Sequence, residues 1–593
     1  TLNAADGNTG VGTGVFAALT TGDNNVAVGL NSLEANTSGA DNTAVGYKSL
    51  CSNTTGGLNT AVGVTALEKN TEGTQNVAVG LNALKNNLTG TCNTSVGYQS
   101  LNDNTTGTGN IAIGKNALVA NTTGADNTAV GTLALDANTT GDNNVAVGQN
   151  ALTANTTADK NTAVGYNSLL ANTTGAHNVA VGARAGDANT TGTQNTFVGG
   201  DYNGGPGGAN TTGGCNTFIG NDSGMKNTTG SFSTSVGAES SCNGTTSHSN
   251  AALGYKALKL LTTGNHNVAI GREAMISNTT GTRNTGIGAY ALNGNTTAEA
   301  NTAVGYSALQ TNTTGLCNTA VGDEALKDNT TANNNTAVGK ISATNNTTGT
   351  NNSTLGFQSF FTNTTGSGNV AIGVNSLYAN TTASNNTAIG LSALEANTTA
   401  SCNTAVGKSA LVTNTTGYNN TSVGVENMKQ TTTAHSNTAI GFQAMCTTTT
   451  GHNNVSIGYN SISSSATAEN EITLGNSGSN NLRCNDTSIS SLSDLRDKKN
   501  IEDIPHGLDY ILALRPVKFD WNRRDGSFKG KKDYGFIAQE LDQVEETFGN
   551  KEYTRLVSKE NPDKWEADPM KTYPILIKAI QELKAEIELL KNK

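Results

Sequence analysis

The stretch Asn42-Thr43-Ala44-Val45-Gly46 decides the fold, because variants of it return every 17 residues along most of the chain. Counted by its glycine, the series runs from Gly12 to Gly199 and, after four extra residues, from Gly220 to Gly475, which makes 28 repeats. The residue before the glycine is Val, Ile or Leu in every repeat, and the residue four before it is Asn in all but two. Self-similarity at a fixed short period is the sequence signature of a solenoid.

Seventeen residues are too few for a repeat of paired helices and suit one coil of a parallel β-solenoid, so we expect a mainly β rod over residues 1–476. Alternation around the motif predicts a short strand whose aliphatic residue points inward. A Leu four residues after the glycine, such as Leu50, supplies a second core position, and an Asn-Thr-Thr-Gly turn closes the coil. Stacking places Asn over Asn, so that the amides satisfy one another. At roughly 4.8 Å per strand, the coils make a rod about 130 Å long.

Three features of the repeats concern the loops and side chains of the rod. The four extra positions in residues 200–215 are expected to form a bulging surface loop rather than a domain break. Seven of the eight cysteines lie five residues before or after a repeat glycine, which favours small buried side chains over disulfides. The recurring Asn-Thr-Thr triplets, for example at Asn121, Asn138 and Asn172, are formal glycosylation sequons, although turn chemistry is the simpler explanation of their position.

Composition places a domain boundary near residue 490. Both tryptophans and five of the six prolines lie in the last hundred residues. Residues 494–593 contain 19 of the 35 Lys and Arg residues and 20 of the 45 Asp and Glu residues. The preceding residues therefore carry 16 basic and 25 acidic side chains, a net charge of −9. So dilute and acidic a segment is unsuited to binding nucleic acid. No apolar run approaches the ~20 residues that span a bilayer, and no signal peptide is visible. The cysteines lack metal-site spacing, so we expect neither metal nor cofactor.

The repeat pattern over residues 8–476 resembles the heads of trimeric bacterial adhesins, whose repeats also centre on Asn-x-Ala-Val/Ile-Gly with a usually shorter period. This resemblance implies a left-handed β-roll and three parallel chains packed side by side.

After a Ser- and Asn-rich connector over residues 477–492 comes the stretch Ser493-Asp494-Leu495-Arg496-Asp497-Lys498-Lys499-Asn500-Ile501. Its pattern Ser-Asp-x-Arg-x-Lys-x-Asn-Ile resembles the opening of the self-cleaving intramolecular chaperone domain found at the C-terminus of phage tail spikes and endosialidases. Three later blocks agree, at residues 514–521, 534–541 and 573–583. The resemblance implies a small α+β chaperone and autoprotease domain over residues 493–593.

The residue types present are compatible with a single-turnover self-cleavage, although their spacing alone favours a structural role, and the case for cleavage comes from the four matching blocks. A serine hydroxyl becomes a nucleophile when a base takes its proton, and a lysine serves as that base if burial lowers its pKa. The family resemblance implies that Ser493 is the nucleophile, Lys498 the base and Leu492–Ser493 the scissile bond, with Asp494 orienting the site. Lys499 is a rival base. In a purely structural alternative, Ser493 caps a helix that begins at Asp494, and Lys498 is solvated.

The closing segment predicts a coiled coil over residues 574–593. Apolar residues recur there at alternating spacings of four and three, at Leu576, Ile580, Leu583, Ile587 and Leu590. A repetitive rod pairs almost equally well in many registers, so a C-terminal trimeriser would fix the alignment of three chains. We therefore expect a homotrimeric viral or extracellular fibre that attaches to a host-cell receptor or glycan. The alternative is a structural or adhesive filament that retains an uncleaved chaperone.

Overall fold

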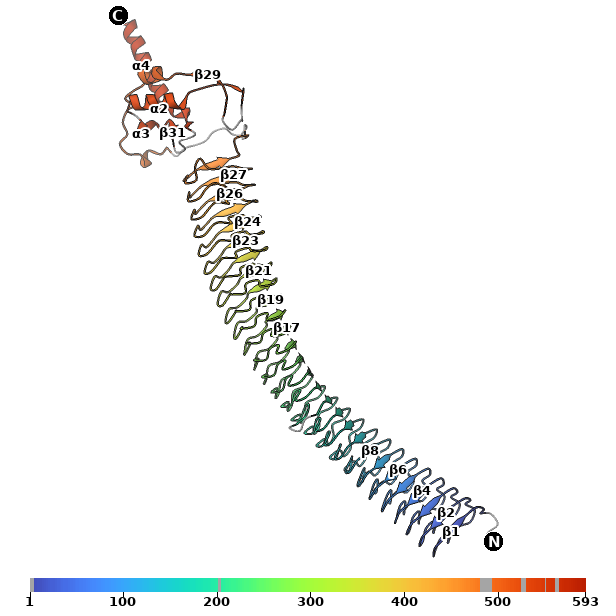
Figure 1. The fold of residues 1–593 in the computed structure, drawn as a ribbon. Helices are drawn as coiled ribbons and strands as arrows, with labels where there is room; N and C mark the ends of the chain where they lie inside the picture. Colours follow the sequence, from blue (N-terminus) through green and yellow to red (C-terminus); the bar gives the residue numbers. More distant parts are fainter. Residues whose placement is uncertain (1–4, 201–203, 480–492, 524–528, 550, 560–564) are drawn as a thin grey trace. The chain divides into compact units, whose positions relative to one another are not determined.

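A computed structural model describes residues 5–200, 204–479, 493–523, 529–549, 551–559 and 565–593 (Figure 1). The chain divides into two compact units, residues 1–365 and 366–593. The first unit consists of solenoid coils, and the second contains further coils and the C-terminal domain. The connector 480–492, and with it Leu492, lies outside the described residues.

Each coil contributes one three-residue strand, and successive strands pair in parallel with a shift of 17 residues, as Thr43 with Thr60. The predicted solenoid of 17-residue coils is confirmed. The strands of the first unit are β1 (Thr9–Val11), β2 (Val26–Val28), β3 (Thr43–Val45), β4 (Thr60–Val62), β5 (Val77–Val79), β6 (Thr94–Val96), β7 (Ile111–Ile113), β8 (Thr128–Val130), β9 (Val145–Val147), β10 (Thr162–Val164), β11 (Val179–Val181), β12 (Thr196–Val198), β13 (Thr217–Ile219), β14 (Thr234–Val236), β15 (Ala251–Leu253), β16 (Val268–Ile270), β17 (Thr285–Ile287), β18 (Thr302–Val304), β19 (Thr319–Val321), β20 (Thr336–Val338) and β21 (Ser353–Leu355). Those of the second are β22 (Val370–Ile372), β23 (Thr387–Ile389), β24 (Thr404–Val406), β25 (Thr421–Val423), β26 (Thr438–Ile440), β27 (Val455–Ile457) and β28 (Ile472–Leu474).

The strand faces the core with its central alanine rather than with its valine. Ala44 and Leu50 are fully buried, whereas Val45 is half-buried on the outer face. The expected leucine is therefore confirmed, but the expectation that the larger aliphatic residue of the strand points inward is wrong. Leucine fills the narrow interior and leaves room for only a methyl group at the strand. The repeat glycine is needed because a Cβ on Gly46 would lie 2.3 Å from the Gly63 carbonyl oxygen of the next coil.

Two buried asparagine ladders run along each stack, as the sequence predicts. Within one coil, the amide nitrogens of Asn42 and Asn53 donate to the carbonyl oxygen of Gly56 over 2.9 and 2.8 Å. Each also donates to the asparagine one coil earlier, Asn42 to Asn25 over 3.0 Å and Asn53 to Asn36 over 2.8 Å. Because both amide hydrogens are used, these side chains are satisfied without water.

The same ladders bury the asparagines of the glycosylation sequons. Asn138 is fully buried, and its amide nitrogen donates to Asn121 and to Gly141 over 3.0 Å each. Its side-chain oxygen accepts from Asn155 over 2.9 Å. The asparagine that an oligosaccharide would have to reach is therefore part of the core in the folded chain.

Ordinary coils have a small alanine at the centre of the strand and a large leucine four residues after the glycine. In the coils around residue 200 the large side chain lies in the strand and the leucine position has none. Phe197 is fully buried at the strand position, and the leucine position holds Gly186 and Gly207. A Cβ on Gly186 would lie 2.4 Å from Phe197 Cδ2, and one on Gly207 would lie 2.3 Å from Cε1. Phe218 has the same relation to Gly224. The four extra residues fall between β12 and β13, which pair with a shift of 21 residues, as Thr196 with Thr217. Residues 201–203 lie outside the described part. Residues 205–207 are buried, so the expectation of a surface loop is wrong for them, because Gly207 packs against the ring of Phe197.

The cysteines depart from the expected burial. The seven cysteines in the described residues are free. Cys242 is buried, but Cys92, Cys317 and Cys402 are exposed. The expectation of small buried side chains is therefore wrong for these three, all of which lie five residues before a repeat glycine.

The C-terminal domain mixes short helices with two small hairpins. Its elements are the 3₁₀ helix η1 (Leu495–Asp497), α1 (Leu508–Ala513), β29 (Val517–Asp520), β30 (Lys532–Gly535), α2 (Ala538–Thr547), α3 (Lys551–Thr554), β31 (Val557–Ser558), β32 (Glu566–Ala567), the 3₁₀ helix η2 (Pro569–Thr572) and α4 (Tyr573–Lys591). β29 pairs with β30 and β31 with β32, both antiparallel. Tyr510, Leu541, Leu556 and Ile575 form its small buried core.

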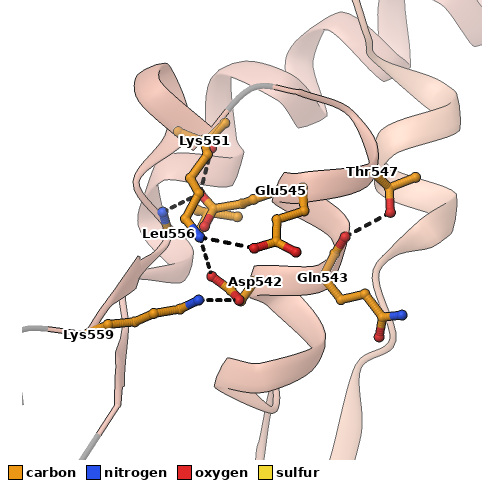
Figure 2. Close-up of polar contacts among 9 residues, drawn as sticks. Asp542, Gln543, Glu545, Thr547, Lys551, Leu556 and Lys559 are labelled. Atoms are coloured by element: carbon orange, nitrogen blue, oxygen red, sulfur yellow. Dashed lines mark hydrogen bonds and ion pairs between the residues drawn. The ribbon is translucent and has the colours of Figure 1, made fainter. Parts of the chain in front are cut away.

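A polar cluster ties α2 to the segment that follows it (Figure 2). Asp542 pairs with Lys551 over 2.8 Å and also with Lys559. The buried Glu545 accepts from the backbone N–H of Leu556 over 2.6 Å and from the Thr554 hydroxyl over 2.5 Å. Burial alone raises the pKa of Asp542, but the hydrogen bonds from the two lysines outweigh it and hold the pKa below its ordinary value.

Candidate active site

Ser493 and Lys498, which sequence reasoning had paired, lie in contact. The Lys498 Nζ donates a hydrogen bond to the Ser493 Oγ over 2.6 Å. Lys499, the rival base, makes no such contact within the described residues. A nucleophile and its base need this separation, so the geometry suits proton transfer from the hydroxyl to the amine.

The helix η1 produces this contact by turning the chain. Asp494 is its N-cap and accepts from the backbone N–H of Arg496 over 2.8 Å. At the other end the Lys498 N–H donates to the Leu495 carbonyl oxygen over 3.2 Å, which brings Lys498 back towards Ser493. The alternative in which Ser493 is the cap is therefore wrong, because Asp494 occupies that place.

Asp494 contacts Arg496 rather than the serine and lysine. The Arg496 Nε donates to Asp494 Oδ1 over 3.0 Å, and the Nη2 donates to Oδ2 over 2.5 Å. The side-chain hydrogen bond from Arg496, followed by the backbone one, lowers the pKa of Asp494, and the same pair raises the pKa of Arg496. The sequence had not revealed this pair of hydrogen bonds between Arg496 and Asp494, which stabilises the turn of η1 from its solvent side.

The site is open to solvent in a single chain. Ser493 and Lys498 are both exposed. Burial favours the neutral, proton-accepting form of a lysine. The described residues of one chain do not bury Lys498.

The same domain exposes the predicted heptad seam. Leu576, Ile580, Leu583, Ile587 and Leu590 on α4 are between 39% and 70% exposed. The helix buries a different face, through Ile575 and Ala579, and Glu582 accepts from the Leu508 N–H of α1 over 2.7 Å. One chain thus anchors α4 and leaves its apolar seam uncovered.

The coils also carry an apolar row on their outer face. The residue before each repeat glycine points away from the core, and Val79, Leu253 and Ile440 are 37%, 45% and 42% exposed. All 28 repeats have Val, Ile or Leu there. Contiguous apolar surface of this kind marks a place where another molecule packs.

Within the described ranges there is no group of three or more His, Cys, Asp or Glu arranged to hold a metal ion. No helix in that part of the chain combines the length and apolarity that crossing a membrane requires.

Comparison with known proteins gives one finding. No curated protein matches the chain. Residues 493–550 match the model of the Peptidase S74 family, described as the chaperone of endosialidase, so the match begins at Ser493 and includes η1, α1 and α2. The C-terminal part of this chain thus carries the pattern of the endosialidase chaperone family, behind a long parallel β-solenoid.

Proposed function

We propose that the chain is a homotrimeric fibre whose C-terminal domain directs assembly and then cleaves itself from the rod between Leu492 and Ser493. The observation that carries this proposal is the 2.6 Å contact between Ser493 and Lys498 at the first residue of the family match.

The chemistry follows from that contact. Lys498 takes the proton of the Ser493 hydroxyl, and the Oγ attacks the carbonyl carbon of Leu492. The bond from that carbon to the Ser493 nitrogen breaks, the nitrogen leaves with a proton as an amine, and an ester joins Leu492 to the Oγ. Water then hydrolyses the ester and completes one turnover per chain. Asp494 and Arg496 act as positioning residues that hold the turn of η1.

Assembly comes before cleavage in this scheme. The open site of one chain leaves Lys498 in water, so burial by neighbouring chains is what activates it. The exposed seam of α4 is the surface through which three chains would first associate. The outer row of Val, Ile and Leu residues then packs between the rods, since a single rod would leave this row exposed to solvent.

The mature rod would present its polar edges to a host-cell receptor or glycan, on a virion or another extracellular surface. The second candidate is a filament that keeps its chaperone uncleaved. The exposure of Lys498 to solvent in a single chain is the observation that favours it.

Denaturing gels and intact mass of the expressed chain separate the two candidates. Self-cleavage predicts fragments ending at Leu492 and beginning at Ser493, loss of cleavage in Ser493→Ala and Lys498→Met, and normal cleavage in the control Lys499→Met. An intact wild-type chain excludes the protease. Light scattering tests assembly separately, and the mass of a single chain would exclude the fibre.

A further inference from the structure

The last coil of the solenoid ends in an open strand edge. Each strand N–H three residues before a repeat glycine donates to the next coil, as Val455 N–H does to the Glu471 carbonyl oxygen over 2.8 Å. Each carbonyl one residue before the glycine accepts from the next coil, as Ile457 does from Gly475 over 2.7 Å. In β28 the corresponding groups are the Ile472 N–H and the Leu474 carbonyl. A further strand would bond to them.

The side chains of this edge add to its tendency to associate. β28 pairs with β27 on one side, and among the described residues no strand pairs with its other edge. Ile472 and Leu474 are 71% and 54% exposed. Open edges with apolar side chains are templates for pairing with another chain.

One residue in this coil breaks the most regular column of the solenoid. The position four before the glycine is asparagine in 26 of 28 repeats, and there its side-chain oxygen accepts from the next coil, as Asn454 does from the Glu471 N–H over 2.9 Å. In the last coil this position is Glu471.

The carboxylate of Glu471 is turned back into its own coil. It accepts from the Ser464 N–H over 3.0 Å, from the Ser464 hydroxyl over 2.8 Å and from the Thr473 hydroxyl over 2.9 Å. Among the described residues no lysine or arginine pairs with it. Its charge is satisfied by neutral donors while the end of the stack faces water.

We propose that Glu471 terminates the coil stack and prevents a second copy of this chain from adding to its C-terminal end. A coil stacked on β28 would enclose the carboxylate without a cation, and burying an unpaired charge is strongly unfavourable. Asparagine at the same place would instead offer the acceptor that every other coil uses. The inference rests on the proposed release of residues 493–593, because release separates the C-terminal domain from this end of the rod.

The test compares rods freed from the C-terminal domain. A recognition sequence for a site-specific protease, placed within residues 480–492, frees the rod whether or not the chain cleaves itself. A gel of the uncut chain reports self-cleavage separately. The variants are Glu471→Asn and Glu471→Gln, with Glu469→Gln as the matched control, since Glu469 is an exposed carboxylate two residues away that pairs with His452 over 3.3 Å.

Sedimentation over a concentration series and electron microscopy measure the outcome. We expect wild-type and Glu469→Gln rods to stay single, and both Glu471 variants to join end to end with at least a doubling of mass. Circular dichroism confirms that the solenoid is retained. The proposal is overturned if Glu471→Asn and Glu471→Gln rods stay single, or if wild-type or Glu469→Gln rods join to the same extent.

Discussion

The exchange of core sizes around Phe197 gives a quantitative prediction. Replacing Phe197 by Ala removes a fully buried ring from a site whose facing positions, Gly186 and Gly207, have no side chains to fill the space. A phenylalanine-to-alanine change in a core costs about 3–5 kcal/mol. Since ~1.4 kcal/mol is tenfold in an equilibrium constant, local opening of β11 to β13 should become about a hundred to a few thousand times more frequent.

The second half of the prediction is rescue. Gly186→Leu alone should also destabilise, because its Cβ would meet Phe197 at 2.4 Å. Leucine is acceptable to the backbone there, since Leu169 in the preceding coil has the same left-handed conformation with φ of 48°. With Ala at 197 and Leu at 186 the pair becomes that of an ordinary coil, so the double variant should recover most of the loss.

Hydrogen exchange measured by mass spectrometry on peptides that span β11 to β13 is the appropriate assay. It reports local opening without requiring a two-state transition of the whole chain. Phe360→Leu, read on the peptides around β21, is the control, because it restores the leucine usual at that position and should cost less than about 1.5 kcal/mol. Additive losses in the Phe197→Ala/Gly186→Leu double variant would refute the reasoning, since they would mean that the two sites do not share one space.

Three further outcomes are expected. The double variant Ile580→Asp/Leu583→Asp should give single chains by light scattering and should not cleave, because the substitutions place charges in the apolar seam of α4. Persistence of trimers would exclude that seam as the surface of association. Folded protein treated with an oligosaccharyltransferase should gain no glycan at Asn138, whereas the unfolded chain should, as judged by mass; modification of the folded form would contradict the burial of this amide. Asp542→Asn should destabilise the C-terminal domain at pH 7 in thermal melts. The lowered pKa makes the contribution of Asp542 present above its unfolded pKa, ~3.9, and lost as pH falls through the folded pKa, so the difference from wild type should vanish in acid. A difference that persists at pH 2 would contradict this origin.

The period and the leucine core were predictable because 28 repetitions average out local ambiguity, but the direction of the strand was not. Val45 is more hydrophobic than Ala44, and nothing in one coil says that Leu50 already fills the interior. The sequence also hides the backbone that makes this packing possible: Leu50 has a φ of 50°, which is uncommon for leucine and is held by the coils on either side. The size exchange at Phe197 depends on residues 11 before and 10 after it in the chain, which only the stacking brings together.

In the candidate site, the pairing of Ser493 with Lys498 was predictable because family resemblance fixes both positions. The part played by Asp494 was not. A carboxylate beside a serine suggests direct orientation of the nucleophile, yet the three-residue helix places it against Arg496 instead. Its described contacts are with the side chain and backbone of Arg496 in that turn.

The constant spacing of 17 residues between paired strands has a consequence for how such a chain changes over evolutionary time. Duplication or loss of one unit by unequal recombination between near-identical gene segments inserts or removes a complete coil, with its ladder partners already matched. Reach would then change in steps of about 4.8 Å, with no new type of contact to be selected. Coils that are no longer interchangeable, such as the pair around Phe197 and the last one at Glu471, would be the fixed points of that variation.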